Sequence, residues 1–374
     1  MYRTLILCLL LPLPARADDK RDHFTDGARN FRDVMEHLKS DYLDDLSDDD
    51  FYRAAVAGML SAGGRSWDQL LSPSEMAALR GDLAGEVVGV GIELKLDEAT
   101  QSLVVARVLD GAPADKGGIV AGDQLLQIDG KPVVGRPMMD VVRTIRGAAG
   151  TAIQLTMLHA GQVVVRSLHR DKVVLAPVGE EDLGDGVALI KLRSFNEKTP
   201  ALLEQALRAA SARHARGLVL DVRGNPGGLF DAMVACAGML LPRGATVAQL
   251  ERRGGAVETI RTGRDPVLAG VPIVVVANPS TASGAEILAG ALRDGLGARV
   301  IGSKTFGKWN VQRIDELPNG WAIKYTTGRF RTARGEALDG KGLIPDLEVE
   351  PGAADSAHHD GQLRAAAALL KLSR

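Results

Sequence analysis

A serine that precedes a helical pattern and a lysine in a later loop are the residues of this chain best suited to chemistry. Ser283 stands where an apolar run, residues 272–277, gives way through a polar turn to a helical pattern over residues 287–292. Such a junction presents a hydroxyl beside unpaired helix N–H groups, so it can serve a nucleophile and a developing oxyanion together. Taken alone, Ser283 would be an ordinary helix cap.

Lys308 lies close to two aromatic residues, Phe306 and Trp309, and could be the base that Ser283 needs. A serine hydroxyl is a poor nucleophile until a neighbouring group takes its proton. Lysine can do so only where burial or nearby charge lowers its pKa and leaves a neutral amine. Gln312 is expected to face the same side of a strand as Lys308 and to orient it by accepting a hydrogen bond.

A glycine-rich turn over residues 221–228 is the second expected part of an oxyanion-binding site. It follows a strand pattern over residues 217–223 and precedes a helical pattern over residues 229–241. Gly227 and Gly228 come after a proline, and glycines let backbone N–H groups approach a ligand closely. A phosphate-binding loop is the poorer interpretation, because the glycine order and the lysine of such loops are missing.

The region around these residues, about 173–352, alternates strand and helix patterns. Strands are expected over 186–192, 217–223 and 272–277, and helices over 200–212 and 229–241. This alternation predicts a mixed α/β domain whose βα units cover a buried sheet. Residues 353–374 are expected to form a linker and a short amphipathic helix. A serine–histidine–aspartate enzyme is disfavoured, because the sequence has no G-x-S-x-G turn.

Residues 87–172 carry a β-rich pattern that closely resembles a PDZ domain, with Gly-Ala-Pro-Ala-Asp at 111–115 and Ala-Gly-Asp at 121–123. The resemblance implies a small β-sandwich or barrel with two helices, to which a protein C terminus adds as a strand. The implied carboxylate loop is Gly89, Val90, Gly91 and Ile92. The implied side-chain pocket is Met138, Met139 and Val142, although methionines at helical spacing are more often core residues.

The first residues have the pattern of a secretory signal peptide. A positive charge precedes the apolar run 5–11, and Ala15-Arg16-Ala17 gives a cleavage site, so residues 1–17 are expected to be removed. An uncleaved anchor is the alternative. Residues 18–86 form an acidic, helical N-terminal segment. The formal net charge is −2 and no long basic block is present, so nucleic acid is not an expected partner.

Residues 283–286, Ser-Gly-Ala-Glu, and 307–312, Gly-Lys-Trp-Asn-Val-Gln, resemble at this spacing the carboxy-terminal processing proteases, a serine–lysine family. The resemblance implies a crotonase-like catalytic domain in which Ser283 is the nucleophile, Lys308 the base and Gln312 a supporting group. An N–H group of Gly227 or Gly228 would face that of Gly284 in the oxyanion hole. No metal or organic cofactor is implied.

The chain departs from the family pattern in three places. Gly284 and Ala285 stand where many relatives carry alanine and serine, and Gly224 stands where asparagine is common. Residues 63–69, Gly-Gly-Arg-Ser-Trp-Asp-Gln, replace an aspartate-proline-histidine-serine turn. This last difference is expected to affect regulation or docking more than catalysis.

We therefore expect an exported serine endopeptidase, periplasmic or secreted, that cleaves proteins recognised through exposed C-terminal tails. Peripheral attachment to a membrane stays open. One alternative is a catalytically silent PDZ adaptor that binds protein C termini, and another is a hydratase of acyl-coenzyme A, because the crotonase-like fold is similar. Protein or peptide substrates are the expected partners, and an activator or adaptor protein and self-association stay open.

Overall fold

The computed structural model describes residues 19–65, 67–97, 100, 102–136, 138–173, 176–350 and 360–372, and the chain divides into two compact units, residues 1–66 and 67–374. The side chains of residues 19–24, 87, 139 and 372 also lie outside the described set. The expected signal peptide, residues 1–17, falls outside it too. In the described part of the chain, no helix is long and apolar enough to cross a membrane.

The first unit consists of two helices, α1 (Asp19–Asp41) and α2 (Asp48–Ser61). Ser47 caps α2, because its hydroxyl accepts a hydrogen bond from the N–H of Asp50 and the Asp50 carboxylate accepts one from the N–H of Ser47. This reciprocal arrangement pairs two N–H groups that a helix start leaves without partners. The acidic cluster at residues 48–50 is thus the start of a helix.

The PDZ-like part of the second unit is built on an antiparallel sheet with the order β3-β4-β5-β7-β8. Its strands are β3 (Ile92–Asp97), β4 (Ser102–Val108), β5 (Gln124–Ile128), β7 (Ala152–His159) and β8 (Gln162–His169), with β6 (Lys131–Pro132) paired to β5. Helices α4 (Pro113–Lys116) and α5 (Met138–Ile145) complete it. Strands β2 (Val87–Gly89) and β9 (Asp171–Val173) pair where the chain enters and leaves this part.

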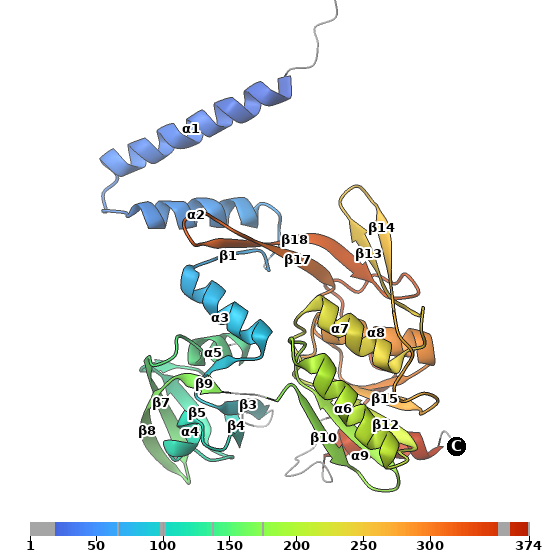
Figure 1. Ribbon diagram of the computed structural model, residues 1–374. Helices are drawn as coiled ribbons and strands as arrows, with labels where there is room; N and C mark the ends of the chain where they lie inside the picture. The colour runs from blue at the N-terminus through green and yellow to red at the C-terminus, as the bar shows by residue number, and fades with distance from the viewer. Residues whose placement is uncertain are drawn as a thin grey trace, which may run out of the picture. The chain divides into compact units, whose positions relative to one another are not determined.

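The larger part of the second unit has a six-stranded sheet in which all neighbours except β10 and β11 are parallel. Its order is β10 (Val178–Asp182), β11 (Val187–Leu192), β12 (Gly217–Asp221), β15 (Ile273–Ala277), β16 (Arg299–Gly302) and β19 (Leu347–Glu348). The expected strands and helices of this region are present, so the mixed α/β fold is confirmed (Figure 1).

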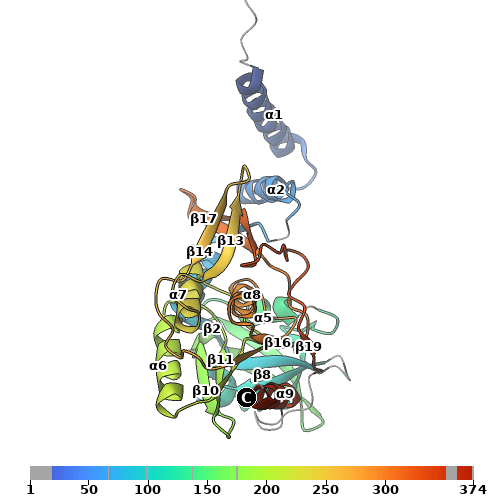
Figure 2. The same ribbon diagram turned by 90° about the vertical axis from the view of Figure 1, so that its right-hand side faces the viewer.

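Period-two alternation along β11 assigns each side chain to one of two cores. Ala188, Ile190 and Leu192 pack under α6 (Thr199–Ala212), α7 (Phe230–Leu240) and α8 (Gly284–Leu296). Val187 and Leu189 face the opposite side, where α9 (Gly361–Leu372) covers the sheet (Figure 2). Because alternate residues of a strand point to opposite faces, a fully apolar strand needs helices on both sides.

A second sheet stands beside the first and carries part of the site. It has the order β1 (Gln69–Leu71), β18 (Ala322–Arg331), β13 (Thr246–Arg252) and β14 (Val257–Arg261), and β17 (Asn310–Glu316) also pairs with β18. Strand β1 and helix α3 (Pro73–Ala84) lie in the segment 18–86 that the sequence analysis assigns to one helical region. The pairing of β1 with β18 instead makes residues 67–86 part of the second unit.

Truncation of Leu370 to alanine should lower the free energy of unfolding by about 2–5 kcal/mol, because the side chain fills the space between α9 and the sheet. A Cβ atom on Gly217 would lie only 3.1 Å from it, which shows how tightly the helix packs. Arg364→Ala, at an exposed position of the same helix, is the control. Urea unfolding measures both, and equal midpoints for the two variants would contradict this packing.

Candidate active site

Ser283 occupies a strained backbone position at the turn between β15 and α8. Its φ and ψ angles are 55° and −121°, a region that costs a residue with a side chain about 1–3 kcal/mol. Three hydrogen bonds hold the turn: Ser283 N–H donates to Glu286, Ile287 N–H donates to the Ser283 carbonyl, and Ala282 N–H donates to the Asn225 carbonyl. Backbone strain fixed in this way is common at catalytic positions.

Gly227 and Gly228 bring a second backbone segment against the serine. A Cβ atom on Gly227 would lie 2.8 Å from Ser283 Cβ and 3.0 Å from the nitrogen of Gly284, so only glycine fits there. The Gly227 N–H donates to Asn225 Oδ1 at 2.8 Å, whereas the N–H groups of Gly228 and Gly284 have no hydrogen-bond partner among the described residues. Of the two glycines, Gly228 therefore has the free donor.

Asn225 fixes this glycine segment from within, and sequence reasoning did not single it out. Its side chain is fully buried and donates from Nδ2 to the carbonyl of Leu192, while Oδ1 accepts from Gly227. Its carbonyl accepts from Ala282 N–H at 2.9 Å. One residue thus joins β11, the glycine segment and the Ser283 turn. Its position before a proline and two glycines is the only sequence feature that marks it.

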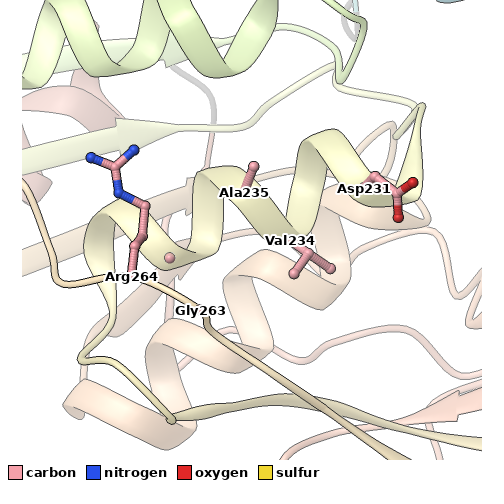
Figure 3. A pocket seen from close by; sticks show the side chains of 6 residues that line it. Asp231, Val234, Ala235, Gly263 and Arg264 are labelled. Carbon is pink, nitrogen blue, oxygen red and sulfur yellow. The ribbon is translucent and has the colours of Figure 1, made fainter.

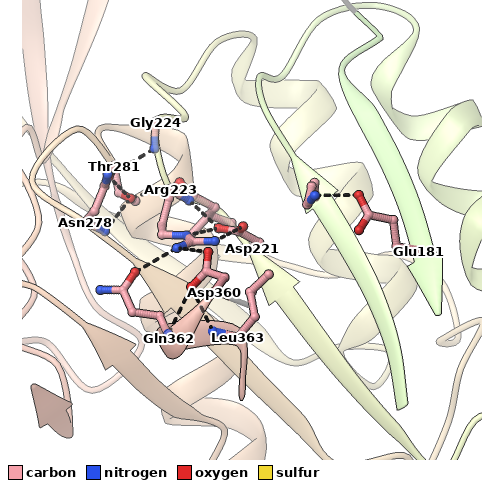
Figure 4. A network of polar contacts seen from close by, with 11 residues as sticks. Glu181, Asp221, Arg223, Gly224, Asn278, Thr281, Asp360, Gln362 and Leu363 are labelled. Carbon is pink, nitrogen blue, oxygen red and sulfur yellow. Dashed lines mark hydrogen bonds and ion pairs between the residues drawn. The ribbon is translucent and has the colours of Figure 1, made fainter. Parts of the chain in front are cut away.

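Arg223 connects the same loop to the C-terminal helix (Figure 4). Its guanidinium binds Asp221 through Nε and Nη2, at 2.9 and 2.7 Å, and its Nη1 lies 2.8 Å from both Gln362 Oε1 and Asp360 Oδ2. Burial alone would lower the pKa of Arg223, but Asp221 and then Asp360 hold it above its usual value. Nearby, Asn278 Oδ1 accepts from the N–H of Gly224.

Glu286 joins the serine turn to the lysine loop. The residue has 0 % exposure, and its Oε2 accepts the N–H groups of Ser283 and Lys308, at 2.9 and 2.8 Å. Its Oε1 accepts the N–H of Gly307 and the hydroxyl of Thr305. Glu286 is not among the residues expected to form the site, although an acidic residue three positions after a helix-capping serine is a recognisable pattern.

Lys308 is half-buried, and this is enough to change its proton affinity. Burial, and then the charge of Lys324, lowers its pKa from 10.5 to about 8, while Asp68 acts in the opposite direction. Its Nζ lies 5.6 Å from the centre of the Trp67 ring. No hydrogen bond joins Nζ to Ser283 Oγ or to any other group in the described ranges, so this structure holds the two side chains unengaged.

The expected hydrogen bond between Gln312 and Lys308 is not formed. Gln312 Nε2 donates instead to the carbonyl of Trp67 at 2.8 Å and lies 3.5 Å from Asp68 Oδ1. Two residues of the segment 63–69, which is expected to affect regulation or docking more than catalysis, also lie close to the lysine. Since β1 pairs with β18, it carries Trp67 and Asp68 to the lysine, which no local sequence pattern reveals.

The residues expected to bind a C-terminal tail lie on the turn between β2 and β3 and on α5. Gly89 ends β2 and Ile92 begins β3, while Gly91 has a φ of 81° and leaves no room for a Cβ atom beside Ala112. The N–H groups of Val90 and Gly91 are unpaired in the bonding of the described chain. Met138 packs on the domain core, Val142 is half-buried on α5, and the Met139 side chain is outside the described set.

A shallow pocket lies on α7, the helix that follows the glycine segment (Figure 3). Val234, Ala235 and Gly238 form its apolar wall, with Asp231, Gly263 and Arg264 around them. Arg264 is also paired with Glu204 at 2.9 Å. No residue that the sequence analysis assigned to catalysis or peptide binding lines this pocket, so the candidate site is defined by the Ser283 and Lys308 loops.

Comparison with known proteins identifies the family to which this chain is similar. Residues 186–349 match the profile of peptidase family S41, and residues 83–158 match that of the PDZ domain. A probable CtpA-like serine protease of Staphylococcus haemolyticus is 32% identical over 314 residues, covering 83% of this chain and 62% of that protein. The carboxy-terminal processing protease CtpA of Bacillus subtilis is 30% identical, covering 85% of this chain and 68% of that one.

Solved structures agree with the sequence relatives. The photosystem II D1 C-terminal processing protease is 30% identical, with a TM-score of 0.62 over 91% of this chain and 92% of its own. An S41 protease from Bacteroides fragilis, 16% identical, has the same fold with a TM-score of 0.60. From the matched domains and from relatives that align over most of this chain, we conclude that the chain belongs to peptidase family S41 and carries a PDZ domain.

Proposed function

We propose that this protein is a serine endopeptidase that processes protein substrates at their C-terminal ends, with Ser283 as nucleophile and Lys308 as base. The observation that carries the proposal is the Glu286 carboxylate, which binds the backbone N–H groups of both residues on one buried side chain. A lysine whose pKa is lowered to about 8 can be neutral close to physiological pH, as a base must be.

The reaction follows from these groups. The neutral amine of Lys308 takes the proton of Ser283 Oγ as the oxygen attacks the scissile carbonyl carbon. The N–H groups of Gly284 and Gly228 are free to hold the negative oxygen that forms. The lysine then gives the proton to the leaving amine, and water releases the acyl group by the same steps. Lys308 must turn towards Ser283, which a flexible four-carbon side chain allows.

The PDZ-like part is proposed to bind the substrate's C-terminal tail. The unpaired N–H groups of Val90 and Gly91 would receive the terminal carboxylate, and the tail would extend along β3 between that strand and α5. Val142 is the half-buried residue of α5 best placed for the side-chain pocket.

We also propose that the protein is exported. Support comes from the sequence of residues 1–17 alone, where a positive charge, an apolar run and an Ala-x-Ala site follow in order.

Replacement of Ser283 or Lys308 by alanine should reduce cleavage of an unfolded reporter with an apolar C-terminal tail by roughly 10³-fold or more, since each takes part in bond making. Lys304→Ala, an exposed lysine in the same loop, is the matched control and should leave cleavage unchanged. Tail dependence is read by comparing reporters with and without the apolar tail. Undiminished cleavage by Ser283→Ala would disprove the assignment, and a protein that binds tails without cleaving any would be an adaptor.

The rate should rise with pH through a midpoint near 8, the pKa of Lys308. Below that value the lysine is protonated and cannot accept the serine proton, so kcat/KM at pH 6 should be about a hundredfold below its plateau. Steady-state measurements between pH 6 and 10 test the sign. A flat profile, or a rate still rising steeply at pH 10 as the ordinary lysine pKa of 10.5 would give, would be inconsistent with Lys308 as a base of lowered pKa.

Glu286→Gln should weaken both fold and catalysis. The amide has one acceptor oxygen where the carboxylate uses two to receive four donors. Leaving buried donors unpaired costs about 1–3 kcal/mol each, so we expect a loss of about 2–5 kcal/mol in the free energy of unfolding. Acylation by a serine-reactive probe should slow in parallel. Glu197→Gln, at an exposed position, serves as control, and equal behaviour of the two variants would refute the linking role.

A further inference from the structure

We propose that Trp67 and Asp68 are positioning residues of the active site, with Trp67 covering the amine of Lys308, Asp68 balancing its charge, and Gln312 acting by holding this segment in place. The inference rests on the proposed function. It assigns a role to Trp67 and Asp68, which lie in a segment where this chain departs from the family pattern. It also gives Gln312 a role through Trp67, whereas a direct contact with Lys308 was expected.

Strand pairing brings the segment to the site. Strand β1 pairs with β18 in the register Gln69 with Lys324 and Leu71 with Ala322, so the residues just before Gln69 lie beside the following residues of β18. Asp68 Oδ1 accepts hydrogen bonds from both the N–H and the hydroxyl of Thr326, at 2.9 and 2.8 Å. Thr326 is also the strand partner of Gln312 on β17. The position of Asp68 is therefore fixed from two strands.

Trp67 forms a cover over the lysine. Its carbonyl accepts the hydrogen bond of Gln312, and its ring packs edge-on against Phe306, with 5.1 Å between centres and 61° between planes. The centre of the same ring lies 5.6 Å from Lys308 Nζ, within range of a cation–π interaction. Phe306 in turn donates its N–H to the carbonyl of Thr281 on the serine turn. The cover thus touches the lysine loop, and Phe306 of that loop is bonded to the serine turn.

The charges around the lysine give Asp68 a distinct effect. Lys324 on β18 lowers the pKa of Lys308, and Asp68 is the carboxylate that raises it. Burial, and then the charge of Arg143 on α5, lowers the pKa of Lys324 itself, while Asp68 and Glu75 raise it. Removing the Asp68 charge should therefore lower the pKa of Lys308. Removing the Trp67 ring should raise the pKa of Lys308, because burial, the largest cause of its depression, outweighs the cation–π attraction that favours the charged amine.

The experiment titrates the Lys308 amine directly in the full-length protein. Its reactivity towards acetic anhydride is followed against pH by peptide mass spectrometry, which needs no catalysis. Compared with the unmodified protein, Asp68→Asn should shift the midpoint down by about 0.5 unit and Trp67→Ala should shift it up by about one unit. Asp68→Asn keeps Oδ1 for Thr326, and Asp315→Asn, on the neighbouring strand, is the charge control that should not move it.

Gln312→Ala tests the route through Trp67. If Gln312 acts by holding the tryptophan, its variant should shift the Lys308 midpoint in the same direction as Trp67→Ala, and the double variant should add little. A fully additive double variant would show that Gln312 acts on the lysine independently and would overturn this part. The whole proposal would be overturned if the Lys308 midpoint did not move in Asp68→Asn, Trp67→Ala and Trp67→Phe. It would also be overturned if Asp68→Asn and Trp67→Ala shifted the midpoint in the same direction.

The same samples separate this inference from the proposed function. Labelling of Ser283 by a fluorophosphonate probe reports whether this serine is an activated nucleophile. If the Lys308 midpoints shift but Ser283 is not labelled, the roles of Asp68 and Trp67 stand and the proposed catalysis by Ser283 is refuted. Labelled serine with unmoved midpoints would retain catalysis and refute the roles of Trp67 and Asp68. Thermal unfolding of each variant confirms the fold, and Asp68→Asn decides the question if Trp67→Ala does not fold.

Discussion

The site is organised by one buried carboxylate. Glu286 receives four hydrogen bonds, from the N–H groups of Ser283, Gly307 and Lys308 and from the hydroxyl of Thr305. A carboxylate is costly to bury unless its lone pairs are occupied, and these donors, together with its place in the first turn of α8, meet that condition. All four donors bond the same carboxylate, so the serine turn and the lysine loop both depend on Glu286.

The helix that carries Glu286 makes this possible. A first-turn residue points back towards the N terminus of its helix, where unpaired N–H groups gather. The loop of residues 303–309 supplies the remaining donors, and it arrives beside the helix because β16 lies next to β15 in the parallel sheet. Strain at Ser283 is therefore held by groups that the α/β sheet itself positions, with Asn225 providing the second support from β11.

Local sequence patterns predict much of this architecture, whereas the contacts that depend on pairing between distant strands are seen only in the structure. The strand-to-helix junction at Ser283, the alternation of strands and helices and the glycine loop of the PDZ-like part could all be read from neighbouring residues. The partner of Gln312 could not, because Trp67 lies 245 positions away and meets it only through the pairing of β1 with β18. The choice between Gly227 and Gly228 likewise depends on which way the Asn225 side chain points, and that is a matter of packing.

The contact between Arg223 and the C-terminal helix bears on the order in which the protein matures. Asp360 and Gln362 hold an arginine at the edge of the glycine segment, and α9 follows Ser283 and Lys308 in the chain. During synthesis on a ribosome, both candidate catalytic residues emerge before the residues that brace the loop opposite them. A growing chain therefore lacks the brace until α9 has left the exit tunnel and docked.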